Sequence, residues 1–417
     1  MTATSERAPA SAAGTDPATR DGLGLAVLPA VTEPVLARVA ERAGEVDRAE
    51  ADLWDELAAL GELDLLTAPL PLAAELTHAL ARRCTASAFA LWGHRSAIAY
   101  HEATGTPLPD GAASGVVALA SGMAPAFKEE AGLGEIPLLA TDSPDGAIAV
   151  SGVLPWCSNL RPGGWVVTPV RWEDGRRAVV RHRRDADGVR VKELTGLTAL
   201  DATASGVLLL DEVRIPAQDV LTRDLPAFRD DVRATFLQIQ TAMCLGLAGA
   251  ALDAAEAGAD DVAREVLAEE LSAAAEDWQH LRGALAAGVR AASAVRAGGA
   301  GGPSDAASSG APPSGAPPSG TSPSGPSVAG GSPAGAAPSA PVRPVELVRV
   351  RLKAALLTGR ATRLEQKIVG GRGYALASDT SRRAREAAFL PVQSPTETHL
   401  RHLLARAGVP VPTDGHA

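Results

Sequence analysis

The feature that most constrains the fold is a block of β-prone sequence between about residues 115 and 220, with helical sequence on both sides. Within the block, short runs rich in Val and Ile alternate with three Asp-Gly pairs: Asp145-Gly146, Asp174-Gly175 and Asp187-Gly188. Asp-Gly between β-prone runs is a strong hairpin signal, because glycine adopts the positive φ that a tight turn requires. The sequence therefore predicts a central antiparallel β domain.

Helical periodicity occupies most of the remaining chain. Apolar residues recur three and four positions apart before the β block, and again after it as far as about Gly408. Strands and helices do not alternate, which argues against a parallel sheet of the dinucleotide-binding type. We therefore predict an α+β multidomain protein with an N-terminal helical domain at 23–112, the central β domain at 113–222 and a C-terminal helical bundle at 223–408.

Three segments have compositions that are unsuited to a packed core. Residues 297–341 consist almost wholly of Gly, Pro, Ser and Ala, so they cannot bury enough apolar surface to offset the entropy lost on ordering. Because both flanks have helical patterns, we expect this segment to be a disordered insertion within the C-terminal bundle. We also expect disordered tails at 1–22 and 409–417.

The bulk composition restricts partners and location. The net charge of -10 argues against nucleic acid as a partner, because no excess of cations is available to release counterions from phosphates. The N-terminus lacks the apolar core of a signal peptide, and no run of membrane-spanning length is expected, so we predict a cytoplasmic protein. The three cysteines are widely spaced, which suggests reduced thiols rather than disulfides. His399 and His402 lie one helical turn apart but lack a third metal ligand, so no metal site is predicted.

Two motifs carry a family resemblance. The segment from Lys367 to Thr396 contains K-I-V-G-G-R-G-Y and, further on, R-R-A-R-E-A-A-F-L-P-V-Q-S-P-T. This order resembles the C-terminal end of the acyl-CoA dehydrogenase family, in which a G-G-x-G-[YF] turn, an R-D-A helix and an E-G-T turn help to build a flavin and acyl-CoA site. In the β block, L-P-W-C-S-N resembles the family's K-x-W-I-T-N. The resemblance covers nearly the whole chain outside the tail and the insertion.

The resemblance implies that the protein binds FAD between the β domain and the C-terminal bundle, as a homodimer or homotetramer. Trp156 matches an aromatic residue beside the flavin and Ser158 a hydroxyl that bonds to the isoalloxazine; the alternative is a β-turn with a buried Trp. A flat indole and a hydroxyl both suit a flavin pocket. The cofactor-binding residues that the resemblance implies are Trp156, Ser158, Lys367, Gly370, Gly371 and Thr396, with the Gly segment reaching the flavin of a neighbouring subunit.

The family's catalytic Glu is missing. Counting from the arginine helix places Ser394 at that position, and an alternative location for the Glu in this family falls on Phe236. A Ser hydroxyl cannot act as a base unaided, and the loss of a positioned base costs about 10²–10⁴-fold in rate. Arg382, Arg383 and Arg385 either bind phosphates or form a salt-bridged helix face.

Three functions follow from the resemblance. The first is an FAD-dependent oxidoreductase that acts on an acyl-CoA or acyl-carrier thioester and passes electrons to a partner protein or O₂, with Ser394 at the position of the base. The second is a flavin-dependent monooxygenase of the same fold, with His94 and Ser158 at its site, although a lone His is often structural. The third is a non-catalytic homologue that serves as a binding or assembly subunit.

Overall fold

The structure, a computed structural model, describes residues 20–299 and 343–413. Most of the predicted insertion, from 300 to 341, and most of the predicted tails lie outside these residues. At the edges the described chain is ordered further than we expected. Arg20, inside the predicted N-terminal tail, is buried and pairs with Asp253 and Glu256 at 2.8 and 2.7 Å. The carbonyl of Pro412 accepts a hydrogen bond from Arg401 at 2.6 Å.

In the described part of the chain, four α-helices precede the sheet. A long α4 packs directly on the sheet and is buried along most of its length. It ends where Gly105 adopts a left-handed conformation with φ of 64°, which glycine does without strain. The N-terminal helices are α1 (Glu33–Asp47), α2 (Trp54–Gly61), α3 (Leu70–Ala81) and α4 (Thr85–Thr104).

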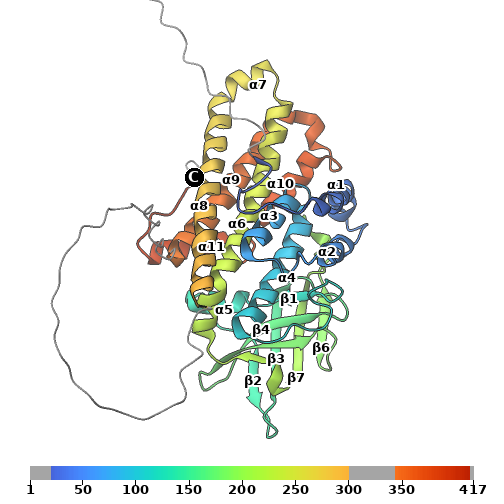
Figure 1. Cartoon of the computed structure of the whole chain (residues 1–417), viewed down its shortest axis with the longest axis vertical. Coiled ribbons are helices and arrows are strands. Elements are labelled where there is room, and N and C mark those ends of the chain that lie inside the picture. The colour runs from blue at the N-terminus through green and yellow to red at the C-terminus, as the bar shows by residue number, and fades with distance from the viewer. Residues whose placement is uncertain (1–19, 300–342, 414–417) are drawn as a thin grey trace, which may run out of the picture.

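The central region is one sheet at one end of the molecule (Figure 1). The strand order is β6-β7-β3-β2-β4-β5-β8, and β1 lies beside β4. The elements are β1 (Leu119–Ser121), α5 (Ala124–Glu130), β2 (Leu139–Asp142), β3 (Ile148–Cys157), β4 (Trp165–Arg171), β5 (Arg177–Arg183), β6 (Val189–Glu193), β7 (Gly206–Ile215) and β8 (Val220–Thr222).

The sheet is mixed, whereas we predicted an antiparallel one. Most neighbours are antiparallel, but β4 runs parallel to β1 and β2. The first two Asp-Gly pairs connect β2 to β3 and β4 to β5, as predicted. The third is not a hairpin, because the strand after Asp187-Gly188 is β6, which pairs with β7. Close packing of Gly188 against the carbonyl of Asp211 on β7 favours this long-range pairing over the local turn.

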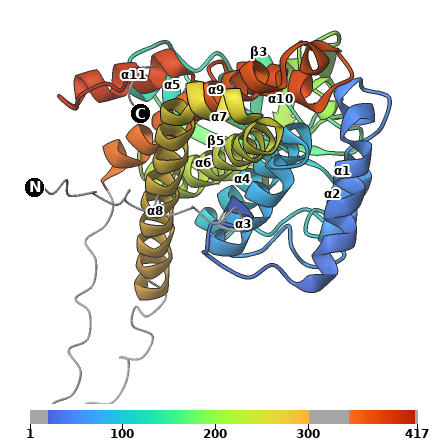
Figure 2. The ribbon, with the colours of Figure 1, turned by 90° about the horizontal axis from the view of Figure 1, so that it is seen from above.

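The C-terminal helices surround α6, which is at the centre of the bundle (Figure 2). Small residues let its neighbours approach: a Cβ on Gly246 would lie 2.4 Å from the carbonyl oxygen of His78 on α3. A 3-10 turn at Gly370–Tyr374 follows α9. The helices are α6 (Leu225–Gly258), α7 (Asp261–Val266), α8 (Ala268–Gly299), α9 (Pro344–Val369), α10 (Asp379–Phe389) and α11 (Glu397–Arg406). The predicted order of helical, β and helical regions is confirmed.

Two expectations need correction here. Helix α6 is long and apolar enough to cross a membrane by length and composition, which the sequence prediction overlooked. Its most apolar window is 94% buried inside the protein, as expected for the core helix of a bundle. Helix α8 extends to Gly299, so it continues past the predicted start of the insertion at 297.

A buried carboxylate fastens α10 to the N-terminal helices. The Glu386 carboxylate accepts hydrogen bonds from the backbone N–H and the hydroxyl of Thr85, at the start of α4, at 3.2 and 2.8 Å. Arg382, one turn earlier on α10, donates to the same carboxylate at 3.1 Å. The negative charge also lies at the positive end of the α4 dipole, which stabilises it further. The α10 helix, and the chain that follows it, are therefore held against α4.

We expect Glu386→Ala to lower the free energy of unfolding by about 3 kcal/mol, because it leaves the start of α4 without its acceptor and the buried Arg382 cation with only the exposed Asp379 as a partner. Denaturant titration measures the effect. Glu397→Ala is the control, since it removes a more exposed pair with Arg401 and should cost less than about 1 kcal/mol. Equal losses in the two variants would show that the network does not fasten α10.

Candidate functional site

A cleft between the sheet and the C-terminal helices brings together Trp156, Ser158, Ser394 and Thr396. It consists of two adjoining cavities. The first, which we call the Ser394 cavity, has a volume of about 260 Å³ and contains all four residues. The second, the Ser205 cavity, has a volume of about 280 Å³ and is lined by Ser205 and Trp156 among others. Both cavities share Phe89, Trp156, Phe389 and Val392, so they form one continuous site.

A bulge presents Trp156 to the cleft. The pairing of β3 with β7 shifts register between Leu154 and Cys157, and Pro155 within this stretch has no N–H to donate. Such a bulge re-aims the side chains that it carries. Trp156 is 47% exposed and faces both cavities, so the buried-Trp alternative is wrong.

The end of β3 is fixed against α4. Asn159 has a φ of 61°, and its buried amide donates to the carbonyls of Ala90 and Leu119 at 2.8 and 3.3 Å. Gly93 makes room for it, because a Cβ there would lie 3.0 Å from the Asn159 amide nitrogen. Trp156 and Ser158 are therefore held by a rigid neighbour rather than by a free loop.

A chain of hydroxyls gives Ser158 a defined polarity. Thr203 donates its hydrogen to the carbonyl of Leu200 at 2.7 Å, so it can only accept from Ser205 at 2.9 Å. Ser205 has then used its own hydrogen and must accept from Ser158 at 2.7 Å. Ser158 Oγ therefore offers lone pairs, and no hydrogen, to the cleft. A ligand N–H group fits this position.

Aromatic rings line the other side of the cleft. Phe89 stacks on Trp92 with ring centroids 5.2 Å apart and meets Phe389 of α10 edge-on at 5.0 Å. Trp92 in turn meets Phe236 of α6 at 4.9 Å. Rings from α4, α6 and α10 thus form one continuous apolar surface. A flat or apolar ligand would be well desolvated here.

The turn between α10 and α11 supplies further polar side chains to the Ser394 cavity. Thr396 caps α11 by accepting a hydrogen bond from the N–H of His399 at 3.3 Å, which leaves its own hydrogen free to donate. Gln240 of α6 donates to the carbonyl of Ser394 at 2.8 Å. Arg351 of α9 donates to both Gln240 and Gln393. The turn is therefore pinned from two helices.

The cleft carries no negative side chain. No Asp or Glu is among the residues that line its two cavities within the described chain. Two cations reach it: Lys128, which is exposed, and Arg385, which is bound to the carboxylate of Asp47 at 2.8 and 2.6 Å. Burial raises the pKa of the Cys157 thiol to about 12, so this residue stays protonated and is not a nucleophile.

Comparisons identify the fold. No protein-family model matches the sequence, and no curated protein matches it. Butyryl-CoA dehydrogenase from Megasphaera elsdenii superposes with a TM-score of 0.70 at 15% identity, over 92% of this chain and 98% of that one. The chain has the acyl-CoA dehydrogenase fold.

Other solved structures with this fold carry different names. KijD3, in complex with FMN and a dTDP-sugar, superposes with a TM-score of 0.68 at 19% identity, over 95% of this chain and 97% of that one. Dibenzothiophene monooxygenase from Paenibacillus sp. A11-2 superposes with a TM-score of 0.62 at 14% identity, over 93% and 99% of the two chains. The acyl-CoA dehydrogenase fold therefore includes proteins named as dehydrogenases and as a monooxygenase.

Both positions predicted for a catalytic Glu lie in the cleft, and neither residue is acidic. Ser394 lines the Ser394 cavity, and its buried Oγ has no hydrogen-bond partner among the described residues. Phe236 lines the same cavity and contributes a ring to the aromatic wall. Ser394 and Phe236 thus line the same cavity, and the described part of the cleft offers no carboxylate in place of either.

His94 lies outside the lining of the cleft. Its Nδ1 accepts a hydrogen bond from the N–H of Leu119 at 3.0 Å, and its Nε2 lies 2.9 Å from the carbonyl of Ala112. These two bonds require the tautomer with hydrogen on Nε2. Burial lowers the pKa of His94 to about 4, so the ring is neutral near pH 7. Both nitrogens are thus used to join α4 to the start of the sheet, in keeping with the structural alternative.

The glycine segment and two of the α10 arginines, Arg382 and Arg383, lie outside the lining of the cleft, whereas Arg385 lines the Ser205 cavity. Lys367, Gly370 and Gly371 do not line the cleft, and Lys367 pairs with Glu270 at 2.5 Å. Contact with a flavin of another subunit stays a prediction. The three arginines of α10 are salt-bridged: Arg382 to Glu386 and Asp379, Arg383 to Glu365, and Arg385 to Asp47.

Sequence reasoning missed Arg351, and it assigned no role to Gln240 or Gln393. A usable signal was present, because Arg351 occupies a position of α9 where the apolar stripe continues and the side chain has to be buried. A buried arginine predicts a polar partner nearby. No cluster of three or more metal-ligating side chains occurs within the described ranges.

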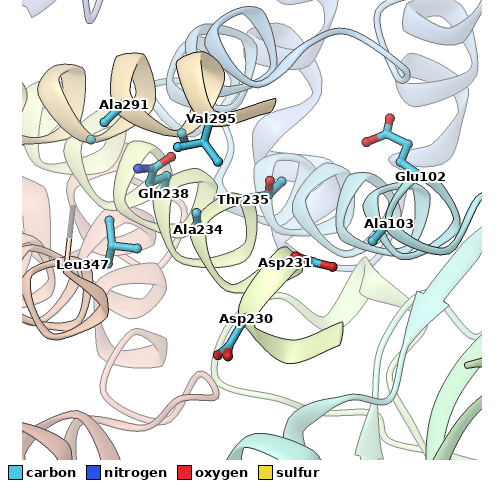
Figure 3. Close-up of a pocket in the computed structure, with 12 residues that line it drawn as sticks. Glu102, Ala103, Asp230, Asp231, Ala234, Thr235, Gln238, Ala291, Val295 and Leu347 are labelled. Carbon is cyan, nitrogen blue, oxygen red and sulfur yellow. The ribbon is translucent and has the colours of Figure 1, made fainter. Parts of the chain in front are cut away.

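A larger cavity of about 480 Å³ lies between α4, α6, α8 and α9 (Figure 3). Gln238 of α6 lies opposite Ala291 and Val295 of α8, with Glu102 of α4 on the other side. It contains none of the residues that the sequence singled out, and it lacks the aromatic wall of the cleft. We therefore assign the functional site to the cleft at Trp156.

His94 should make stability depend on pH. The ordinary pKa of 6.5 applies to the unfolded chain, whereas the folded value is about 4. As the pH falls from about 6.5 to about 4, the unfolded chain takes up a proton that the folded ring refuses, so up to about 3 kcal/mol of stability is lost. Urea titrations across this range should show a smaller loss of unfolding free energy for His94→Asn than for the wild type. If the free energy of unfolding depended on pH in the same way in both proteins, the buried His94 ring would not be the cause of the loss.

Proposed function

We propose that the protein is a flavin-dependent monooxygenase with the acyl-CoA dehydrogenase fold. The observation that carries the proposal is that, among residues 20–299 and 343–413, no acidic side chain lines the cleft, including both positions where a base is expected. Removal of an α-proton from an acyl thioester needs a positioned base, without which the rate falls by about 10²–10⁴-fold. Oxygenation by reduced flavin and O₂ does not need a carboxylate at these positions.

The residues of the cleft fit a flavin. Trp156 offers a flat wall of suitable size, and Ser158 Oγ offers an acceptor to an N–H of the ring system. Thr396 can donate to a ring oxygen or nitrogen from the opposite side. When bound, the flavin would supply electrons to O₂, so that one oxygen atom enters the substrate and the other leaves as water.

The fold neighbours support this choice without deciding it. Dibenzothiophene monooxygenase has the same fold, and the structure of KijD3 holds FMN. FAD is the flavin that the sequence resemblance implies, so binding of FAD and of FMN should be compared.

We propose further that the protein is cytoplasmic and forms a homodimer or homotetramer, in which the Lys367 segment of one subunit reaches the flavin of the next. Dehydrogenation of a thioester is the second candidate, favoured by the likeness to butyryl-CoA dehydrogenase.

Visible absorption tests flavin binding. Purified protein should retain a flavin spectrum after it is soaked with FAD or FMN and desalted. Trp156→Ala should weaken flavin binding by about tenfold, because one stacked aromatic contact is lost. Trp165→Ala is the matched control: its ring lies on β4, outside the lining of the cleft. A colourless protein with either flavin would favour the non-catalytic homologue.

The reaction itself is tested with O₂ and with thioesters. Supplied with reduced flavin, the protein should consume O₂, and a panel of saturated acyl-CoAs should leave the oxidised flavin unbleached under anaerobic conditions. Bleaching by an acyl-CoA would overturn the monooxygenase proposal in favour of the dehydrogenase.

A further inference from the structure

Arg351 is a fully buried cation behind the Ser394 cavity, and all its partners are neutral. It donates to the Oε1 atoms of Gln240 and Gln393 at 3.1 and 3.0 Å, and to the carbonyl of Leu390 at 3.5 Å. Within residues 20–299 and 343–413 it pairs with no carboxylate, and its Nη1 has no hydrogen-bond partner. A buried charge without a counterion is strongly unfavourable. The positive charge is therefore only partly compensated in the protein alone.

The guanidinium determines how the Gln393 amide is oriented. A guanidinium has donors only, so the amide oxygen must face Arg351 and the NH₂ group must face away from it. Gln393 is 2% exposed and lines the Ser394 cavity, and its Nε2 has no partner among the described residues. Because its carbonyl accepts from a cation, the amide is polarised and its N–H groups become stronger donors.

A second unsatisfied group belongs to the next residue in the chain. Ser394 Oγ is buried and has no partner in the described chain, although the residue lines the same cavity. The backbone carbonyl of Ser394 is held by Gln240, which is itself oriented by Arg351. Two buried donors thus occur at adjacent positions of one pinned turn, next to a cation. Buried polar groups are normally satisfied, so both await a ligand atom.

We propose that Gln393 Nε2 and Ser394 Oγ form an anion hole that binds a negatively charged oxygen of the substrate, with Arg351 as a positioning residue that supplies the charge. The proposal rests on the monooxygenase function above and names its substrate class: a compound with an apolar, ring-sized body that ends in a carboxylate, phenolate or enolate. A dry cavity of about 150 Å³ holds benzene, and the Ser394 cavity of about 260 Å³ has an aromatic wall and room for a ring with a short substituent.

Benzoate and benzyl alcohol test the hole, because they share a ring and differ in charge. Both are titrated by calorimetry into the purified full-length protein, with and without saturating flavin. Benzoate should bind about 10- to 100-fold more tightly, which is the contribution of one charge-assisted hydrogen bond. Equal affinities, or a preference for the alcohol, would overturn the proposal.

A third probe distinguishes the sources of the anionic oxygen. The visible absorption of 4-nitrophenol reports its ionisation directly. A lower apparent pKa of the bound probe would assign the hole to phenolates and enolates. Unchanged ionisation together with tight benzoate binding would assign it to carboxylates.

Gln393→Glu is the decisive variant. It keeps the shape of the side chain, pairs with Arg351 and replaces the donor by an acceptor, so benzoate should lose its advantage over benzyl alcohol while thermal unfolding stays cooperative. Gln366→Glu makes the same change at an exposed position of α9 and should keep the preference. A Gln393→Glu protein that still prefers benzoate would show that the hole does not exist.

Two further readouts keep the test independent of folding and of flavin. If Gln393→Glu does not fold, Ser394→Ala removes a single hydroxyl and should weaken benzoate binding about tenfold, with benzyl alcohol unchanged. Unchanged benzoate affinity in that variant would count against the hole. Flavin retention without a benzoate preference contradicts the anion hole alone, whereas a benzoate preference without flavin retention contradicts the monooxygenase alone.

Discussion

The site depends on the buried guanidinium of Arg351. From α9 it reaches α6 through Gln240 and the turn after α10 through Gln393 and Leu390, so three segments far apart in the sequence converge on one group. Because the donors of a guanidinium are fixed in a plane, it also determines the orientation of both amides. Gln240 in turn holds the carbonyl of Ser394. The polar end of the cleft is therefore as rigid as the helices that surround it.

The two sides of the cleft have opposite hydrogen-bonding polarity. On the sheet side, the chain of hydroxyls that ends at Leu200 leaves Ser158 as an acceptor only. On the helix side, Gln393 Nε2 is a donor, with a cation behind it. A bound ring system with N–H groups fits the first side, and an anionic oxygen fits the second. Under the proposed function, the flavin would therefore lie on the acceptor side at Ser158 and the acidic substrate on the donor side at Gln393. The aromatic wall would contact both ligands.

Local sequence patterns predicted the order of helical and β regions, because periodicity and turn chemistry act over a few residues. They failed at Asp187-Gly188, since the partner of β6 is chosen by long-range packing on β7 rather than by the turn. The motifs placed Trp156, Ser158, Ser394 and Thr396 in one cleft, although they lie in separate segments. Arg351 was missed because its role depends on contacts with residues 39 to 111 positions away, which no local pattern records.

The absence of a carboxylate at position 394 is consistent with the buried Arg351 guanidinium nearby. A carboxylate at position 394 would lie close to the buried guanidinium that already polarises Gln393, and an opposite charge at short range lowers the pKa of a carboxyl group. Such a group would be a salt-bridge partner and a poor proton acceptor. With Ser394 in its place, the same cation instead strengthens donors that face the cleft. In this chain the described end of the cleft therefore combines a buried cation with hydrogen-bond donors, an arrangement that suits negative charge on a ligand oxygen better than removal of a proton.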